Sequence, residues 1–246
     1  MKKIYLPLLI SGVFLFSGCA EMQTISNQLP GILTQQTGGI NGVSNSTIST
    51  GLKEALTMGV NDGVLKLGQT NGFNNNSLAR ILLPEELQGV EKTLRSVGLG
   101  SLADQGLKLL NTAAEDAVSE AAPIFTNAIT TMSFQDAANV LLGGNNAATN
   151  YLEQKTTTQL TTAFKPKVAN SLGKVGADKT WSNIISKYNA ITGKNINTDL
   201  NGYVTEQAIK GVFNMVAEKE AAIRGNSSLR TTNVLQQVFA LQDHKM

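Results

Sequence analysis

The sequence predicts an all-α protein, a single compact multi-helix domain of about nine or ten helices behind a lipoprotein signal and a flexible tether. Hydrophobic residues make up 41% of the chain but aromatic residues only 5%. Apolar residues recur at spacings of three and four, which is typical of helices packed on one face. The chain contains no repeat of fixed period, and its amino-acid composition does not change from one part to another. A single domain is therefore the simplest interpretation.

Residues 1–18 have the pattern of a signal peptide. Lys2 and Lys3 precede an apolar run, Ile4–Phe16, and small residues then lead to Cys19. The letters FSGC resemble a bacterial lipobox, which implies that Cys19 becomes the acylated first residue, with palmitate among its chains. An ordinary secretory signal and an uncleaved anchor are the alternatives. We expect a membrane-anchored protein of the cell envelope that faces the periplasm, at the outer membrane.

Residues 19–50 are predicted to be the acylated cysteine and a disordered tether. Past the cysteine they are rich in Gln, Asn, Ser, Thr and Gly, with Glu21 as their one charge. So few large apolar side chains cannot offset the entropy lost on ordering. We therefore expect a helical domain over 51–240 and a frayed C-terminus over 241–246.

Within the domain, periodicity and capping residues predict the helices. Ser101 with Asp104 and Ser133 with Asp136 have N-cap spacing, and Thr198 or Asp199 caps the helix that follows it. Pro166 is expected to bend or restart a helix. The expected helices cover residues 51–69, 84–98, 101–120, 123–132, 133–142, 146–164, 168–175, a segment around Trp181, 199–225, and a last one from Ser227 or Ser228 through Phe239.

The segment Asp199–Phe239 combines the strongest helical period with the densest charges. Its apolar residues fill a broad arc, and Glu220 and Arg224 form an acid-before-base pair on the opposite face. Glu218 falls at the edge of the apolar arc, where an unpaired carboxylate would cost several kcal/mol. We therefore predict a buried ion pair between Glu218 and Arg230. These two residues and Arg224 are the candidate binding or ion-pair residues.

Several motifs occur in a recognisable order: LPEEL, GLADQ, AAPIF, GGNNAATNYLEQKT, FKP, DLNGYVTEQAIKGVF, AEKEAAIR and RTTNVLQQVF. Together they resemble the bacterial lipoprotein family registered as domain of unknown function 4197, over roughly residues 50–240. The resemblance implies a secreted, helical, usually lipid-anchored domain. It implies no activity, ligand or catalytic residue.

The composition argues against several kinds of chemistry. Cys19 is the only cysteine and His244 the only histidine, so we expect no disulfide, no zinc site and no Ser-His-Asp triad. We expect no metal and no cofactor. Removing Lys2 and Lys3 from the 20 basic residues leaves as many as the 18 acidic ones. A neutral mature chain without basic clusters is not expected to bind nucleic acid.

Three functions remain open. We expect a non-enzymatic envelope lipoprotein that binds a protein or another envelope component near the helix over 199–225. The second hypothesis is a pocket between helices for a lipid or small apolar ligand, for which a volume above about 300 Å³ would be evidence. The third is an enzyme that cleaves glycan with an acid from Glu153, Glu206, Glu218 or Asp199.

Overall fold

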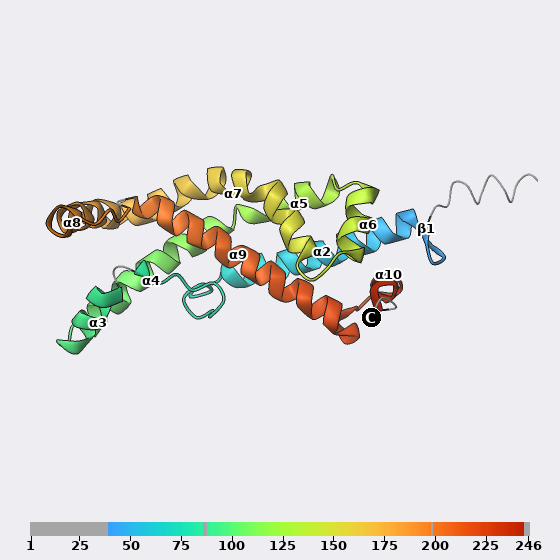
Figure 1. Ribbon diagram of the computed structural model, residues 1–246, viewed down its shortest axis with the longest axis horizontal. Coiled ribbons are helices and arrows are strands. Elements are labelled where there is room, and N and C mark those ends of the chain that lie inside the picture. The colour runs from blue at the N-terminus through green and yellow to red at the C-terminus, as the bar shows by residue number, and fades with distance from the viewer. Residues whose placement is uncertain (1–38, 86–87, 198, 244–246) are drawn as a thin grey trace, which may run out of the picture. The chain divides into compact units, whose positions relative to one another are not determined.

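The computed structural model describes residues 39–85, 88–197 and 199–243 (Figure 1). The described residues from Ile40 onward form one compact unit. The described part holds nine α-helices, which confirms the all-α prediction, and a two-stranded hairpin that the sequence did not predict. The elements are β1 (Gly39–Ile40), β2 (Val43–Ser44), α2 (Asn45–Leu67), α3 (Gln88–Ser96), α4 (Gly100–Val118), α5 (Ala121–Thr130), α6 (Phe134–Leu142), α7 (Ala147–Lys174), α8 (Ala177–Thr192), α9 (Leu200–Gly225), the 3-10 helix η2 (Ser227–Leu229) and α10 (Asn233–Asp243).

The core lies where α9 crosses the other long helices. α9 packs against α7, α2 and α4, while α2 also contacts α5, α6 and α10 (Figure 1). Phe125 of α5 meets Phe213 of α9 edge to face, with ring centroids 5.8 Å apart. Such aromatic pairs add stability beyond their buried area. A helix with neighbours on several sides needs the broad apolar arc seen in its sequence.

The domain begins earlier than the boundary predicted at residue 51. β1 and β2 form a hairpin whose turn residues, Asn41 and Gly42, both have positive φ, as tight hairpin turns require. The hydroxyl of Ser44 then accepts the N–H of Thr47 at 3.1 Å and caps α2. Ile48 is fully buried. Because this stretch is mostly polar, the sequence analysis assigned it to the tether and missed the N-cap Ser44 and the core residue Ile48.

Pro166 does not restart the helix as one alternative predicted, because α7 runs unbroken from Ala147 to Lys174. Proline removes one backbone hydrogen bond from a helix interior. On both sides of it Phe164 and Val168 are fully buried. Burial of this continuous apolar face offsets the lost hydrogen bond, and the separate helix predicted over 168–175 is part of α7.

The capping predictions were confirmed at two of three helices. Ser133 and Asp136 form a reciprocal capping box, and the hydrogen bonds from Ser133 lower the pKa of Asp136 below its usual value. Asp199 caps α9 by accepting the N–H of Gly202 at 2.9 Å. Ser101 is not a cap, since α4 begins at Gly100. Asp104 instead pairs with Arg95 at 2.7 Å.

The last helix begins and ends at other residues than the sequence predicted. A 3-10 turn follows α9, and the last helix begins at Asn233 rather than at Ser227 or Ser228. It continues to Asp243, into the stretch predicted to fray, because Leu241 is buried and Asp243 pairs with Arg230. Only residues 244–246 of that stretch lie outside the described residues.

Replacing Ile48 with Ala tests the early start of the domain. We expect the free energy of unfolding to fall by about 2–5 kcal/mol, because the change leaves a cavity in a packed core. Leu65→Ala on the same helix is the matched control: Leu65 is 68% exposed, so its effect should stay within about 0.5 kcal/mol. Chemical denaturation measures both. Equal effects of the two variants would contradict the assignment of residues 45–50 to the domain.

Candidate functional site

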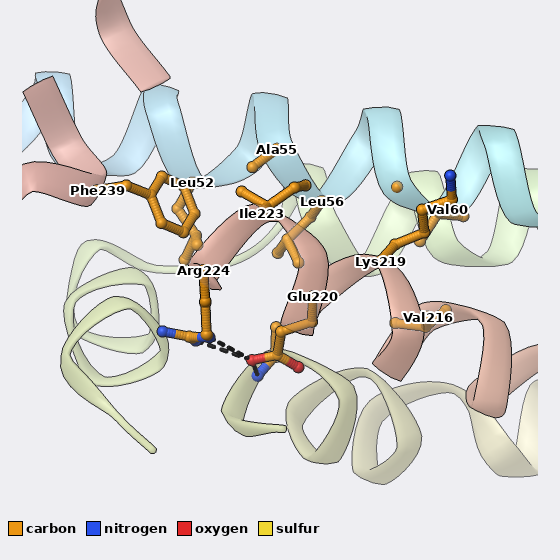
Figure 2. A pocket seen from close by; sticks show the side chains of 12 residues that line it. Leu52, Ala55, Leu56, Val60, Val216, Lys219, Glu220, Ile223, Arg224 and Phe239 are labelled. Carbon is orange, nitrogen blue, oxygen red and sulfur yellow. Dashed lines mark hydrogen bonds and ion pairs between the residues drawn. The ribbon is translucent and has the colours of Figure 1, made fainter. Parts of the chain in front are cut away.

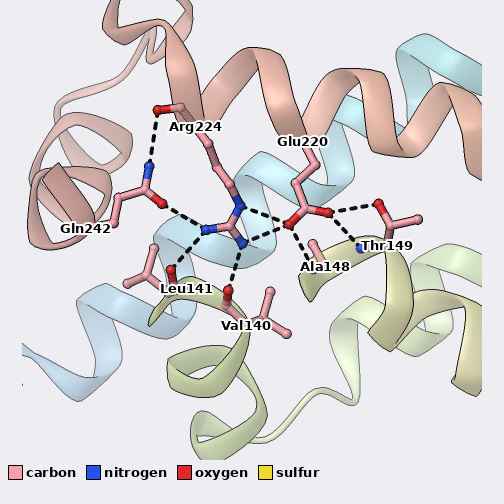
Figure 3. Close-up of polar contacts among 7 residues, drawn as sticks. All are labelled: Val140, Leu141, Ala148, Thr149, Glu220, Arg224 and Gln242. Carbon is pink, nitrogen blue, oxygen red and sulfur yellow. Dashed lines mark hydrogen bonds and ion pairs between the residues drawn. The ribbon is translucent and has the colours of Figure 1, made fainter. Parts of the chain in front are cut away.

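Two charged side chains of α9 meet inside the protein. Glu220 and Arg224 lie one helical turn apart, and Arg224 donates from Nε and Nη2 to Glu220 Oε1 at 2.9 and 2.8 Å (Figure 3). Only 8% of the Arg224 side chain and 5% of the Glu220 side chain are exposed. The predicted pair therefore exists, but on a buried face of the helix rather than on the solvent face.

Glu220 caps the first turn of α7. It accepts the N–H groups of Ala148 and Thr149 at 2.9 and 2.8 Å, and the Thr149 hydroxyl at 2.8 Å (Figure 3). The first turn of a helix has N–H groups without partners and a positive dipole end, both of which favour a carboxylate. The N-cap residue of α7, Asn146, has a positive φ and forms no side-chain cap. Glu220 takes over that role from another helix.

Arg224 performs the opposite task at the end of α6. It donates from Nη2 to the Val140 carbonyl oxygen at 2.7 Å and from Nη1 to that of Leu141 at 3.0 Å (Figure 3). These carbonyl groups belong to the last turn of α6, where backbone acceptors lack partners and the dipole is negative. The Gln242 amide oxygen accepts a further bond from Nη1 at 2.8 Å. One ion pair thus caps two helices of opposite polarity.

Arg230 caps α9 itself. It donates to the carbonyl oxygens of Ile223 and Arg224 at 3.2 and 2.9 Å. Asp243 of α10 holds its guanidinium with two bonds at 2.6 and 3.0 Å. Its guanidinium carbon also lies 5.6 Å from the centre of the Phe239 ring, which favours a cation. We call Glu220, Arg224 and Arg230, with the helix ends that they bind, the capped junction.

Glu218 does not take part in this junction, so the predicted ion pair with Arg230 is wrong. Glu218 is exposed and has no ion pair with a described residue. Two residues along a helix turn the side chain by about 200°, so Glu218 and Glu220 point to opposite sides. The projection identified a buried acid but assigned it to the wrong glutamate, since it assumed a single buried face.

A small apolar pocket lies between α2 and α9, next to the ion pair (Figure 2). Its volume is about 30 Å³. The lining is mainly aliphatic, with the ion pair and Lys219 as its charged members. That space is large enough for a water molecule, since one needs about 10–15 Å³ of this kind of volume. It is far too small for a lipid chain.

A larger groove opens on the side of α9 that carries Glu218. It has a volume of about 410 Å³ and is lined by the end of α2, the asparagine-rich segment after it and one residue of α9. We call it the polar groove. Its members are Lys66, Gln69, Thr70, Asn71, Gly72, Asn75, Asn76, Ser77, Leu78 and Glu218.

Buried contacts hold the asparagine-rich wall of the polar groove. Glu115 of α4 accepts the N–H groups of Asn71 and Phe73, both at 3.2 Å, and the Phe73 ring is fully buried. The ring packs at Gly211 of α9, where a Cβ atom would lie 3.0 Å from Phe73 Cε1. Asn214 of α9 donates to the Leu78 carbonyl oxygen at 2.7 Å. The groove is therefore a fixed surface rather than a loose loop.

Several polar side chains that line the polar groove have no partner in the part of the chain that the structure describes. Among the described residues, no hydrogen bond or ion pair involves the side chains of Lys66, Gln69, Thr70, Asn71, Ser77 or Glu218. Amides and hydroxyls both donate and accept, and the two charges have opposite sign. The groove is thus suited to a neutral ligand that forms many hydrogen bonds.

Two further observations concern the described ranges alone. Over these ranges, no group of three or more His, Cys, Asp or Glu residues is placed to hold a metal ion. No helix there is both long and apolar enough to cross a bilayer. Cys19 and His244 lie outside the described residues.

Comparison with known protein families identifies a match. Residues 42–240 match the family described as Protein of unknown function (DUF4197). The chain belongs to this family. No curated protein and no solved structure matches the sequence.

Membership in DUF4197 covers both sites described above. The matched range contains Glu220, Arg224 and Arg230, and also the whole polar groove. It starts inside the hairpin, before α2, in agreement with the early start of the domain. Two contributors to the capped junction, Gln242 and Asp243, lie just past the match.

A double-mutant cycle tests the capped junction. We expect Glu220→Ala or Arg224→Ala to lower the free energy of unfolding by about 3–5 kcal/mol, because each strands a buried charge and uncaps a helix. The double variant should lose less than the sum of the two. Glu218→Ala, on the same helix, should stay within about 0.5 kcal/mol of wild type. Small additive effects in chemical denaturation would mean that the pair is solvated.

Proposed function

We propose that this DUF4197 protein is a lipid-anchored, non-enzymatic module of the cell envelope that binds a polar envelope component in the polar groove. One observation carries the proposal: a groove of about 410 Å³ has a fixed wall and a rim of amides, hydroxyls and charges that have no partner among the described residues. Pockets of this size are typical of ligand sites. Sites with pre-set donors and acceptors bind more tightly because little ordering remains to be done.

The alternative of a lipid or small apolar ligand has weaker support. The apolar pocket between α2 and α9 has a volume of about 30 Å³, far below the roughly 300 Å³ typical of such sites. The small residues of α4 pack instead of leaving space: Ala113, Ala114 and Ala117 are fully buried. They serve close helix contact.

Glycan cleavage also has weaker support than glycan or protein binding. Glycoside hydrolysis usually requires a pair of carboxylates on either side of the bond to be cut. Among the described residues that line the polar groove, Glu218 is the one acidic residue, and it is exposed. A single solvated carboxylate, in a groove that Lys66 also lines, is suited to hydrogen bonding and orientation of a ligand.

The anchor part of the proposal rests on the signal-like residues 1–18 and on Cys19. We expect Cys19→Ala to move the protein from the membrane to the soluble fraction while its circular dichroism stays unchanged. The reason is that each buried acyl CH₂ contributes about 0.8 kcal/mol to membrane binding. Ser17→Ala, which keeps the cysteine, is the control. Retention of processed Cys19→Ala in the membrane would contradict an acyl anchor.

Site-specific photocrosslinking in intact envelopes tests the binding part. A photoreactive residue replaces Gln69, which lines the polar groove, or Gln159, an exposed glutamine of α7 outside it. We expect a crosslinked adduct from position 69 and none from position 159. Glu218→Ala should reduce the adduct, because it removes a charged hydrogen-bond acceptor from the groove.

The nature of the adduct identifies the component. Digestion by a protease indicates a protein partner, and digestion by a glycan hydrolase indicates a glycan. Equal adducts from both positions, or an adduct unaffected by Glu218→Ala, would contradict binding in the polar groove. The crosslinked protein keeps its full chain and anchor, so the local concentration near the membrane is the natural one.

A further inference from the structure

The turn between α3 and α4 carries a cluster of exposed aliphatic side chains. Ten large hydrophobic side chains of the described residues are exposed, and three of them, Val97, Leu99 and Leu102, fall within six consecutive positions. Their exposed fractions are 63%, 48% and 59%. Leu109, seven residues after Leu102, is 39% exposed and continues the cluster along the same side of α4. We call these four residues the apolar tip. Exposed apolar residues that gather in one place mark interaction sites, whereas scattered ones need no explanation.

The backbone of this turn is closed by its own hydrogen bonds. The Leu99 N–H donates to the Leu94 carbonyl oxygen at 2.8 Å, and the Gly98 N–H donates to that of Arg95 at 3.3 Å. This is the Schellman ending of a helix, and Gly98 has the positive φ of 81° that it requires. The turn lies at an end of the helical domain (Figure 1). It can therefore leave water without exposing these two N–H groups to lipid unpaired.

The charges beside the apolar tip favour an anionic surface. α3 and the first half of α4 contain three cations, Lys92, Arg95 and Lys108, and two acids, Glu91 and Asp104. Arg95 pairs with both acids, at 2.8 and 2.7 Å. Lys92 and Lys108 are exposed and form no ion pair with a described residue. An anionic surface would thus meet two available cations, while the acids that would repel it are already bound.

A lipid bilayer matches this surface better than a second protein does. A stable interface between proteins takes about 20–30 residues from each side, and four aliphatic side chains on a narrow turn are far fewer. Acyl chains require no complementary shape from the residues that enter them. Leucine side chains flanked by lysines are typical of segments that lie at the membrane interface, where the lysines attract anionic headgroups.

The length of the chain before the domain puts a bilayer within reach. Gly39 is the twentieth residue after Cys19, and a chain of that length spans at most about 70 Å. An acylated Cys19 would therefore keep the domain close to the membrane in which its acyl chains lie. Tethering makes a second contact intramolecular, so a few side chains suffice for binding that would be weak for a free protein.

We propose that the apolar tip is a second membrane contact, in which Val97, Leu99 and Leu102 enter the headgroup region of an anionic bilayer and Lys92 and Lys108 bind its phosphates. This inference rests on the acyl anchor of the proposed function and does not depend on the polar groove. Attachment at a second point restricts the rotation of the domain about its tether. It thereby determines which side of the domain faces the membrane.

Fluorescence of the full-length acylated protein in vesicles tests the contact. Leu99→Cys provides a thiol for the environment-sensitive fluorophore NBD, because the proposed acylation occupies Cys19, the only natural cysteine. Leu65→Cys, at a 68% exposed position of α2, is the matched control. In vesicles of phosphatidylcholine and phosphatidylglycerol with brominated acyl chains, we expect a blue shift and loss of most fluorescence at position 99 and neither change at position 65. No quenching at position 99, or equal quenching at both positions, would overturn the proposal.

Substitutions in the protein labelled at position 99 test the neighbouring side chains. Leu102→Asp should reduce the blue shift and the quenching, because it places a charge where the apolar tip enters the bilayer. Leu65→Asp should change neither, and circular dichroism should show an intact fold in both, since both positions are exposed. Wild-type quenching in Leu102→Asp would overturn the assignment.

The two lysines are tested by changing the lipid. Lys92→Gln combined with Lys108→Gln should reduce quenching in the anionic vesicles but not in vesicles of phosphatidylcholine alone. The same response in the variant and the wild type with both lipids would overturn the role of the lysines.

Flotation of the vesicles separates this inference from the anchor. Protein that floats with the vesicles but is not quenched at position 99 keeps the anchor and overturns the apolar tip. Protein that does not float contradicts the anchor, and this inference with it. A blue shift that appears without vesicles and increases with protein concentration would mean that a second copy of the chain covers the apolar tip, which would overturn the bilayer as its partner.

Discussion

The ion pair between Glu220 and Arg224 is the interaction on which the arrangement of helices depends. The two side chains are buried and 2.8 Å apart, a costly arrangement unless each keeps further partners. Those partners are the first N–H groups of α7 and the last carbonyl groups of α6. The pair therefore fixes where one helix ends and the next begins. The connection between them, which includes Gly143 and Gly144, needs no cap of its own.

The C-terminal half of α9 carries buried charges that stabilise the fold on one side and an exposed charge on the other. Glu220 and Arg224 face the interior, whereas Glu218 faces the polar groove. Glu220 thus stabilises the fold, whereas Glu218, two positions away on the same helix, contributes to ligand binding in our proposal. Rigid packing of the junction holds α9 in place. The groove, whose opposite wall is anchored by Glu115 and Phe73, gains a fixed shape from that packing.

Helix periodicity and capping residues predicted most of the fold but little of the site. The Ser133 capping box and the Asp199 cap depend on residues three positions apart, so the sequence contains the whole signal. Glu220 caps a helix through the N–H group of Ala148, 72 residues earlier in the chain, and no local pattern encodes that distance. The polar groove was missed for the same reason, since it joins residues 66–78 to Glu218. One local signal was available: Asn146, at the start of α7, has no acid three residues later to complete a capping box.

The capped junction also determines when, during synthesis of the chain, the helices can be fixed to one another. It joins residues 140–149 to residues 220–243, so a chain emerging from the ribosome lacks the charges that cap α6 and α7 until synthesis is nearly complete. Contacts between such distant residues form late, because a long loop must close first. A partly made chain can form local helices but cannot lock them together. In our proposal the protein crosses a membrane before it folds, and delayed closure would then keep the chain in a form that can be exported.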